Sequence, residues 1–180
     1  MRALVAFALL TVTACASSHP ETARPTSESV RVVGDVAGGS IRMTSSDGVT
    51  TTTIGFAPDK VWGVLAAVYD SLGVPIGTVD SKRMLIGNTG FKAHQKLGKT
   101  SLAKYIDCGK TQGFPSAESY DIYLQVTTQV QPKGDGSNLS TFVEAAGRPI
   151  AFSGEYVKCP TLGALESAIA AGVRDRLKGK

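Results

Sequence analysis

Alternating apolar and polar residues in the second half of the chain restrict the fold more than any other segment does. From Tyr120 to Val130, every second side chain is apolar over most of the run, which is typical of a β-strand with one buried face. The sequence Lys133-Gly134-Asp135-Gly136 then predicts a turn, and the segment from Leu139 to Ala145 repeats the alternation. These segments predict an antiparallel hairpin whose apolar face must be covered by a second layer.

Two segments with helical periodicity can supply that layer. The first is expected to begin at Pro58, whose fixed φ suits a first helical turn, and to end at Gly73, a natural C-terminal cap. Its apolar stripe consists of Val61, Val64, Leu65, Val68 and Leu72. The second is expected to be capped by Thr161, and its stripe consists of Leu162, Leu165, Ile169, Val173 and Leu177. The sequence therefore predicts an α+β fold in which two helices, one of them C-terminal, cover one face of an antiparallel sheet.

Shorter segments are expected to complete this sheet. Before the first helix they are Val30–Val33, Ile41–Met43 and the threonine-rich run Val49–Ile54, with Asp47-Gly48 predicting a hairpin turn. After it, Val74–Val79 and Met84–Asn88 are expected to form a second hairpin, and Phe152–Val157 to form a final edge strand. Residues 90–117 are the least regular part, with a short helix expected between residues 97 and 106.

The N-terminus has the features of an export signal. Met1-Arg2 supplies one positive charge, and the apolar run from Ala3 to Val12 suits the hydrophobic region of a signal peptide. This run is too short for a transmembrane helix, which needs about 20 residues. It ends in Val12-Thr13-Ala14-Cys15, which resembles the bacterial lipobox. The resemblance implies that Cys15 receives a diacylglycerol, that cleavage occurs before it, and that a further acyl chain such as palmitate follows.

The expected domain organisation follows from this resemblance. Residues 1–14 form the signal peptide, residues 15–29 form the lipidated cysteine and a flexible tether, and residues 30–180 form one globular domain. In an organism with two membranes, the absence of Asp at position 16 resembles the signal for transfer to the outer membrane, facing the periplasm; in an organism with one membrane it implies nothing. One alternative stays open, because Ala14-Cys15-Ala16 also fits ordinary signal peptidase, which would yield a secreted protein without lipid.

The remaining two cysteines predict a disulfide bond between Cys108 and Cys159, since exported proteins meet an oxidising compartment. A bond closing a loop of this length stabilises the fold by roughly 4 kcal/mol in the chain-entropy model. Neither cysteine belongs to a C-x-x-C pair, so the sequence predicts neither a metal site nor a redox-active thiol.

The charged residues give little indication of catalysis. The net charge of +4 is too small for a nucleic-acid-binding footprint. His94 is the only histidine in the expected domain, no serine lies in G-x-S-x-G, and the P-loop glycine is missing before both Gly-Lys-Thr segments. We therefore expect no enzyme activity, cofactor or metal. Five lysines of the irregular segment either contact an anionic surface or lie on a plain solvated loop: Lys92, Lys96, Lys99, Lys104 and Lys110.

The order of elements from residue 56 to 177 resembles the helix-grip domains of BamC-like lipoproteins, periplasmic accessories of the outer-membrane β-barrel assembly machine. The local similarity is Val61-Trp62-Gly63-Val64-Leu65 followed by Leu72-Gly73-Val74, a helix ending before a strand. The resemblance implies a non-enzymatic interaction module in an envelope protein complex. Its alternative implication is a carrier or sensor that holds a small apolar ligand or lipid between sheet and helix. No functional residue carries over from it.

Overall fold

The computed structural model describes residues 48–151 and 154–179. The expected signal peptide, the lipidation site Cys15 and the tether lie outside these residues. The same is true of the strands expected at residues 30–33 and 41–43 and of Asp47 in the expected hairpin turn.

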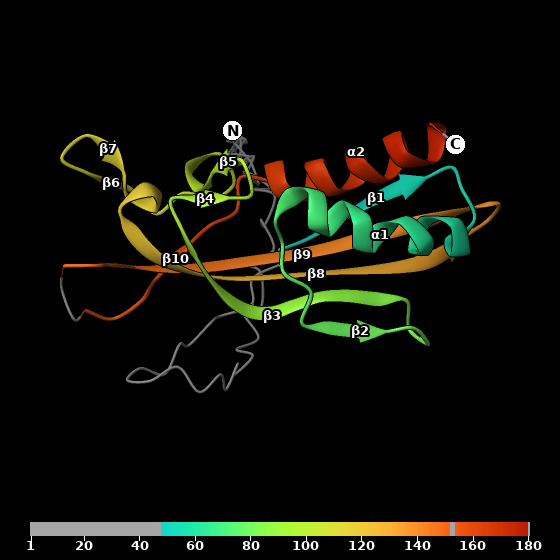
Figure 1. The fold of residues 1–180 in the computed structure, drawn as a ribbon, viewed down its shortest axis with the longest axis horizontal. Helices are drawn as coiled ribbons and strands as arrows, with labels where there is room; N and C mark the ends of the chain where they lie inside the picture. The colour runs from blue at the N-terminus through green and yellow to red at the C-terminus, as the bar shows by residue number, and fades with distance from the viewer. Residues whose placement is uncertain (1–47, 152–153, 180) are drawn as a thin grey trace, which may run out of the picture.

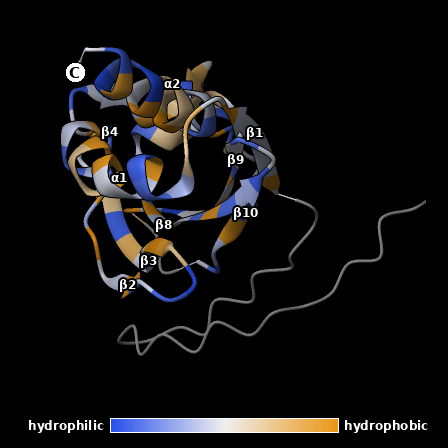
Figure 2. Ribbon diagram, turned by 90° about the vertical axis from the view of Figure 1, so that its right-hand side faces the viewer, coloured by the Kyte–Doolittle hydropathy of each residue, from blue (hydrophilic) through white to orange (hydrophobic). Residues whose placement is uncertain are grey.

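The described chain folds into one main antiparallel sheet with two helices on a single face, as Figures 1 and 2 show. The strands follow the order β1-β9-β8-β3-β4-β5, while β10 also pairs with β9 and β2 with β3. The predicted α+β class and the C-terminal helix are confirmed. In chain order the elements are β1 (Val49–Ile54), α1 (Pro58–Leu72), β2 (Thr78–Asp80), β3 (Leu85–His94), β4 (Lys96–Leu97), β5 (Thr100–Ser101), the 3₁₀ turn η1 (Leu102–Lys104), β6 (Lys110–Thr111), β7 (Phe114–Pro115), the 3₁₀ turn η2 (Ser116–Glu118), β8 (Tyr120–Lys133), β9 (Gly136–Pro149), β10 (Val157–Cys159) and α2 (Ala164–Lys178).

The central hairpin of β8 and β9 is the predicted one, and it is longer than the alternation indicated. Its register runs without interruption from Lys133 opposite Gly136 to Tyr120 opposite Pro149. The face that the helices cover is fully buried on both strands. It consists of Ile122, Leu124, Val126, Thr128 and Val130 on β8 and of Leu139, Thr141, Val143 and Ala145 on β9.

Helix α1 ends where the sequence predicted, at a glycine in the left-handed region. Gly73 has φ 73°, and its N–H donates to the carbonyl of Asp70. A Cβ at Gly73 would lie 2.5 Å from the backbone nitrogen of Gly98, in the turn between β4 and β5. The end of the helix therefore packs directly against this turn, and only glycines permit the contact.

A polar pair of residues fixes the helix layer over the sheet. Tyr69 on α1 lies outside the predicted apolar stripe, but its side chain is completely buried. Its hydroxyl donates to Thr128 Oγ1 at 2.8 Å, and Thr128 Oγ1 lies 3.0 Å from Thr141 Oγ1 on the neighbouring strand. Two threonines on the apolar face of the hairpin are thus hydrogen-bonded rather than left unsatisfied.

The start of α2 differs from the prediction. The helix begins at Ala164 with Gly163 as its N-terminal cap, and Leu162 is 55% exposed rather than part of the buried stripe. Thr161 forms an isolated antiparallel bridge with Ile106, and its hydroxyl accepts from the N–H of Gly163. The prediction that Thr161 caps the helix is wrong, because the chain is still extended at this residue.

Several shorter elements have bounds that differ from the predicted ones. The first strand of the second hairpin is only Thr78–Asp80, because residues 74–77 connect it to α1, whereas its partner extends to His94. The prediction of a helix between residues 97 and 106 was wrong. That segment contains β4, β5 and the single turn η1, because its apolar residues dock individually into the core. The last edge strand is Val157–Cys159, whereas it was expected at Phe152–Val157, of which residues 152–153 lie outside the described residues.

Candidate interaction site

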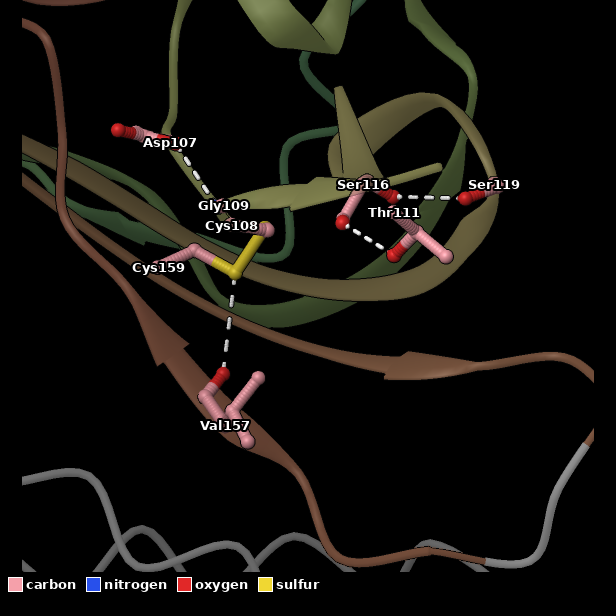
Figure 3. The surroundings of a disulfide bond; sticks show 8 residues. All are labelled: Asp107, Cys108, Gly109, Thr111, Ser116, Ser119, Val157 and Cys159. Carbon is pink, nitrogen blue, oxygen red and sulfur yellow. Dashed lines mark hydrogen bonds between the residues drawn. A yellow bond between two sulfur atoms is a disulfide. The ribbon is translucent and has the colours of Figure 1, made fainter. Parts of the chain in front are cut away.

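The disulfide predicted from the cysteine count is confirmed. Cys108 and Cys159 are bonded, with their Cα atoms 4.5 Å apart, as Figure 3 shows. Cys159 ends β10, which pairs with β9, while Cys108 follows the segment that docks η1 into the core. The bond therefore attaches the irregular part of the chain to the edge of the main sheet.

Backbone contacts of the residues just before Cys108 strengthen this attachment. The N–H of Asp107 donates to the carbonyl of Pro160, and the N–H of Leu162 donates to the carbonyl of Tyr105. Tyr105 and Ile106 are themselves buried in the core. The segment before Cys108 is thus held by a covalent bond, a short ladder and apolar burial together.

A small hairpin stands on this base. Its strands β6 and β7 pair through Lys110 with Pro115 and Thr111 with Phe114. Gln112 and Gly113 form the turn with φ of 52° and 87°, the two positive values that a tight type I′ hairpin turn requires. The carbonyl of Gly109 accepts from Ser116 N–H at 2.9 Å and closes the hairpin at its base.

Side chains also fasten the base of this hairpin. Thr111 Oγ1 and Ser116 Oγ share a hydrogen bond of 2.8 Å, and the N–H of Gly109 donates to Asp107 Oδ1 at 2.8 Å (Figure 3). Ser116 is buried although it is polar, because its groups are satisfied within the hairpin. These bonds all lie within residues 107–116 and fix the shape of the hairpin at its base.

The hairpin carries the most exposed large apolar side chain among the described residues. Phe114 is 74% exposed, and the hairpin projects at the end of the molecule opposite the β8–β9 turn (Figure 1). An aromatic side chain on a rigid support is a common anchor of protein interfaces, because little conformational entropy is lost when it binds. Phe114 was not singled out in the sequence, although the turn residues Gln112-Gly113 just before it could have indicated a hairpin tip.

The five lysines predicted to contact an anionic surface do not form one cluster. All five are exposed. Lys96 and Lys99 lie in or beside β4, and Lys104 lies in η1, so these three share the segment beside the end of α1. Lys110 lies on β6 in the projecting hairpin, next to the base that the disulfide fixes. Lys92 lies on β3 opposite Tyr123, on the sheet face turned away from the helices.

A pocket lies at the edge of β9, between the ends of β1 and β10 (Figure 2). The pairing of β1 stops at Val49 opposite Phe142, and that of β10 stops at Cys159 opposite Ala145. Pro160 has no N–H with which to continue the ladder. A pocket of about 210 Å³ occupies this junction. Its lining residues are Gly48, Phe142, Val143, Glu144, Lys158, Pro160 and Thr161.

The wall of this pocket contains a buried carboxylate. Glu144 is only 7% exposed, and its Oε1 lies 3.6 Å from Lys158 Nζ, too far for a hydrogen bond. Burial raises the pKa of Glu144, and the positive charge of Lys158 opposes part of that rise. Gln125, directly opposite Glu144 on β8, also has a buried Oε1 for which the described residues provide no hydrogen bond.

Glu144 was missed because its sequence position gives no sign of burial. The alternation of β9 assigns it to the polar face, where a solvated carboxylate is expected. Burial of this face at Tyr123, Glu144 and Ala146 is a tertiary property. Perturbed carboxylates beside pockets are more often functional than carboxylates in general.

The described residues give little support for a metal site or for catalysis by a histidine. Residues 48–151 and 154–179 contain no group of three or more metal-ligating side chains, and His94 is exposed at the end of β3. No described helix combines the length and the apolar character needed to cross a bilayer.

Neither a protein-family model nor a curated protein matches this sequence.

Proposed function

We propose that this protein is an exported bacterial lipoprotein, anchored to a membrane through Cys15, whose domain is a non-enzymatic interaction module of the cell envelope. The observation that carries this proposal is the disulfide between Cys108 and Cys159. Disulfides persist in the compartments outside the cytoplasm, and the lipobox-like N-terminal sequence supplies a route to them. In a Gram-negative cell the expected position is the outer membrane, facing the periplasm.

The surface that we propose for partner binding is the β6–β7 hairpin. The disulfide fixes its base, and Phe114 projects from its second strand opposite Thr111. An exposed aromatic anchor of this kind fits a protein partner with an apolar pocket.

The alternative of an apolar-ligand carrier has weaker support. Such a ligand would lie between the sheet and the helices, where Leu65, Val68, Tyr69 and Ile169 are completely buried. These side chains belong to one continuous apolar core within the described residues. A ligand there would have to displace well-packed side chains.

Lipidation is tested by growing expressing cells with globomycin and with radiolabelled palmitate. We expect label on the wild-type protein, none on Cys15→Ala, and accumulation of the unprocessed precursor with globomycin. Normal maturation without label would instead support the secreted form that ordinary signal peptidase produces after Ala16.

Partner binding is tested by site-specific photo-crosslinking in intact envelopes. A benzoyl-phenylalanine replaces Phe114 in one variant and Val79, which is 58% exposed on β2, in a matched control. We expect one discrete crosslinked species from position 114 and none from position 79. Equal patterns from both positions, or no adduct at either, would contradict the role of the hairpin.

A further inference from the structure

We infer that the pocket at the junction of β1, β9 and β10 receives the Phe114 side chain of a second copy of this chain, so that two copies form a reciprocal pair. The inference rests on the proposed function, because it names the partner of the β6–β7 hairpin. It is carried by an exposed aromatic side chain and a pocket of matching size on the same molecule.

The side chain that enters the pocket is Phe114, which is 74% exposed. The tip that carries it, residues 111–115, contains no charged residue. Phe114 lies directly opposite Thr111 in the β6–β7 pair, and the positive φ values of Gln112 and Gly113 define the turn beside it. The ring can therefore enter a pocket without taking a charge of its own tip out of water.

The pocket has the volume and the walls that a phenyl ring needs. Its volume is about 210 Å³, and an apolar cavity of about 150 Å³ is large enough to bind benzene. The lining includes Phe142 and Pro160, whose rings are apolar. Phe142 projects from the sheet face turned away from the helices, whereas Val143 projects to the buried face and presents only its backbone. Two phenylalanine rings in contact are more favourable than their buried area alone indicates.

A charged pair in the pocket lining favours a neutral occupant. Glu144 Oε1 lies 3.6 Å from Lys158 Nζ, so the charge of the buried carboxylate is already offset within the molecule. A charged ligand would have to compete with one member of this pair. An aromatic ring leaves both members in place, and its face is attractive to the neighbouring ammonium group.

The hairpin and the pocket are joined through the disulfide. Cys159 stands between Lys158 and Pro160 of the pocket lining, and it is bonded to Cys108. Phe114 follows Cys108 in the same hairpin, but its exposure shows that it does not fill the pocket of its own chain. Each molecule thus carries both halves of one complementary contact. Two copies related by a twofold axis can exchange these halves, which makes two equivalent contacts and closes the pair.

The first experiment identifies what Phe114 contacts in intact cells. The full-length protein is coexpressed with two different affinity tags, and benzoyl-phenylalanine replaces Phe114 in one of the tagged copies. We expect a crosslinked species of twice the monomer mass that carries both tags. Mass spectrometry should locate the new bond at Phe142, Pro160 or Thr161.

The identity of the crosslinked species separates this inference from the proposed function. A discrete adduct with a different protein would overturn the inference and leave the interaction module intact. A bond between two copies that lies outside the pocket would also overturn it. Absence of any adduct at position 114 would contradict both the inference and the role of the hairpin.

Matched variants test the two halves of the contact separately, with sedimentation equilibrium of the purified mature protein as the measurement. Phe114→Ala should weaken self-association at least about thirtyfold, the loss expected when a buried aromatic anchor is truncated. Phe142→Ala should also weaken it, because the pocket loses a ring from its wall. Val79→Ala, which truncates a side chain that is 58% exposed on β2, is the control and should leave self-association unchanged.

Mixing the two weakened variants distinguishes loss of the contact from loss of folding. A mixed pair retains one intact contact, in which Phe114 of the Phe142→Ala copy enters the intact pocket of the Phe114→Ala copy. Each variant alone retains none, so the mixture should associate more tightly than either variant. Equal association would overturn the inference, as would a monomeric wild-type protein or assemblies larger than a pair. Wild-type self-association of Phe114→Ala would overturn it even if Phe142→Ala failed to fold.

Discussion

Loss of the Cys108–Cys159 disulfide is expected to destabilise the domain strongly. The bond joins residues 51 positions apart, and the chain-entropy model assigns a loop of this length about 4 kcal/mol of stabilisation. For a domain of this size, 1 kcal/mol corresponds to about 3 °C in melting temperature. We therefore expect the double variant Cys108→Ala/Cys159→Ala to melt about 12 °C below the wild type.

Differential scanning calorimetry with and without reductant tests this value. The double variant should be insensitive to reductant, and the reduced wild type should melt close to the variant. This second comparison matters because Cys159 is only 1% exposed, so alanine there also removes packing. The reasoning fails if reduction of the wild type leaves its melting temperature within about 2 °C of the oxidised value. It also fails if thiol titration of the unfolded, unreduced protein detects Cys108 and Cys159 as free thiols.

Three further substitutions probe the core, a backbone contact and the buried carboxylate. Tyr69→Phe removes the 2.8 Å bond to Thr128 and should lower the free energy of unfolding by about 1–2 kcal/mol in urea titration; an unchanged midpoint would show that the bond contributes nothing net. Gly98 has φ 57°, and Gly98→Ala would place a Cβ 2.7 Å from the carbonyl oxygen of Leu72. The substitution should lower the free energy of unfolding by about 1–3 kcal/mol in the same titration. A smaller decrease would mean that the turn shifts freely. Glu144 has a raised pKa when folded, so its contribution to stability is complete below its unfolded pKa and is lost as pH rises through the folded value. Glu144→Gln should therefore melt like the wild type near pH 4 and above it near pH 8, and a pH-independent difference would refute the assignment.

The parts of the fold that the sequence predicted well are those governed by local periodicity. The hairpin from Tyr120 to Pro149 follows from alternation over many residues joined by a glycine-containing turn. Helix α1 follows from its stripe, from Pro58 at its start and from Gly73 at its end. In each case the signal lies in one continuous stretch of sequence and agrees with the tertiary structure.

The parts that the sequence did not predict depend on distant partners. β1 pairs with β9, almost ninety residues away in the chain. Thr161 is extended because it bridges Ile106, and this bridge cannot be inferred from the helix stripe that follows. The irregular segment is ordered by burial of single residues such as Leu102 and Tyr105. Isolated apolar residues give no periodic signal.

The same limit applies to the candidate sites. Cysteine count predicted the disulfide, because two cysteines outside any C-x-x-C pair have few other uses in a chain that is expected to be exported. Glu144 is buried although glutamate is usually exposed, and Phe114 is exposed although phenylalanine is usually buried. A residue that violates its ordinary preference is visible only once its neighbours are placed, and such violations are where functional sites are expected.

The disulfide also links the two candidate sites mechanically. Cys159 ends β10, and the residue before it, Lys158, lines the pocket beside Glu144. β10 pairs with β9 over only three residues, so this short ladder alone would hold it weakly. The bond to Cys108 at the last residue of that strand, and the backbone contacts of Pro160 and Thr161 just after it, add further constraints. A force on the hairpin that carries Phe114 is therefore transmitted covalently to the strand that forms one wall of the pocket. In an oxidising compartment the two sites are parts of one rigid unit, whereas reduction would leave only backbone hydrogen bonds and side-chain packing between them.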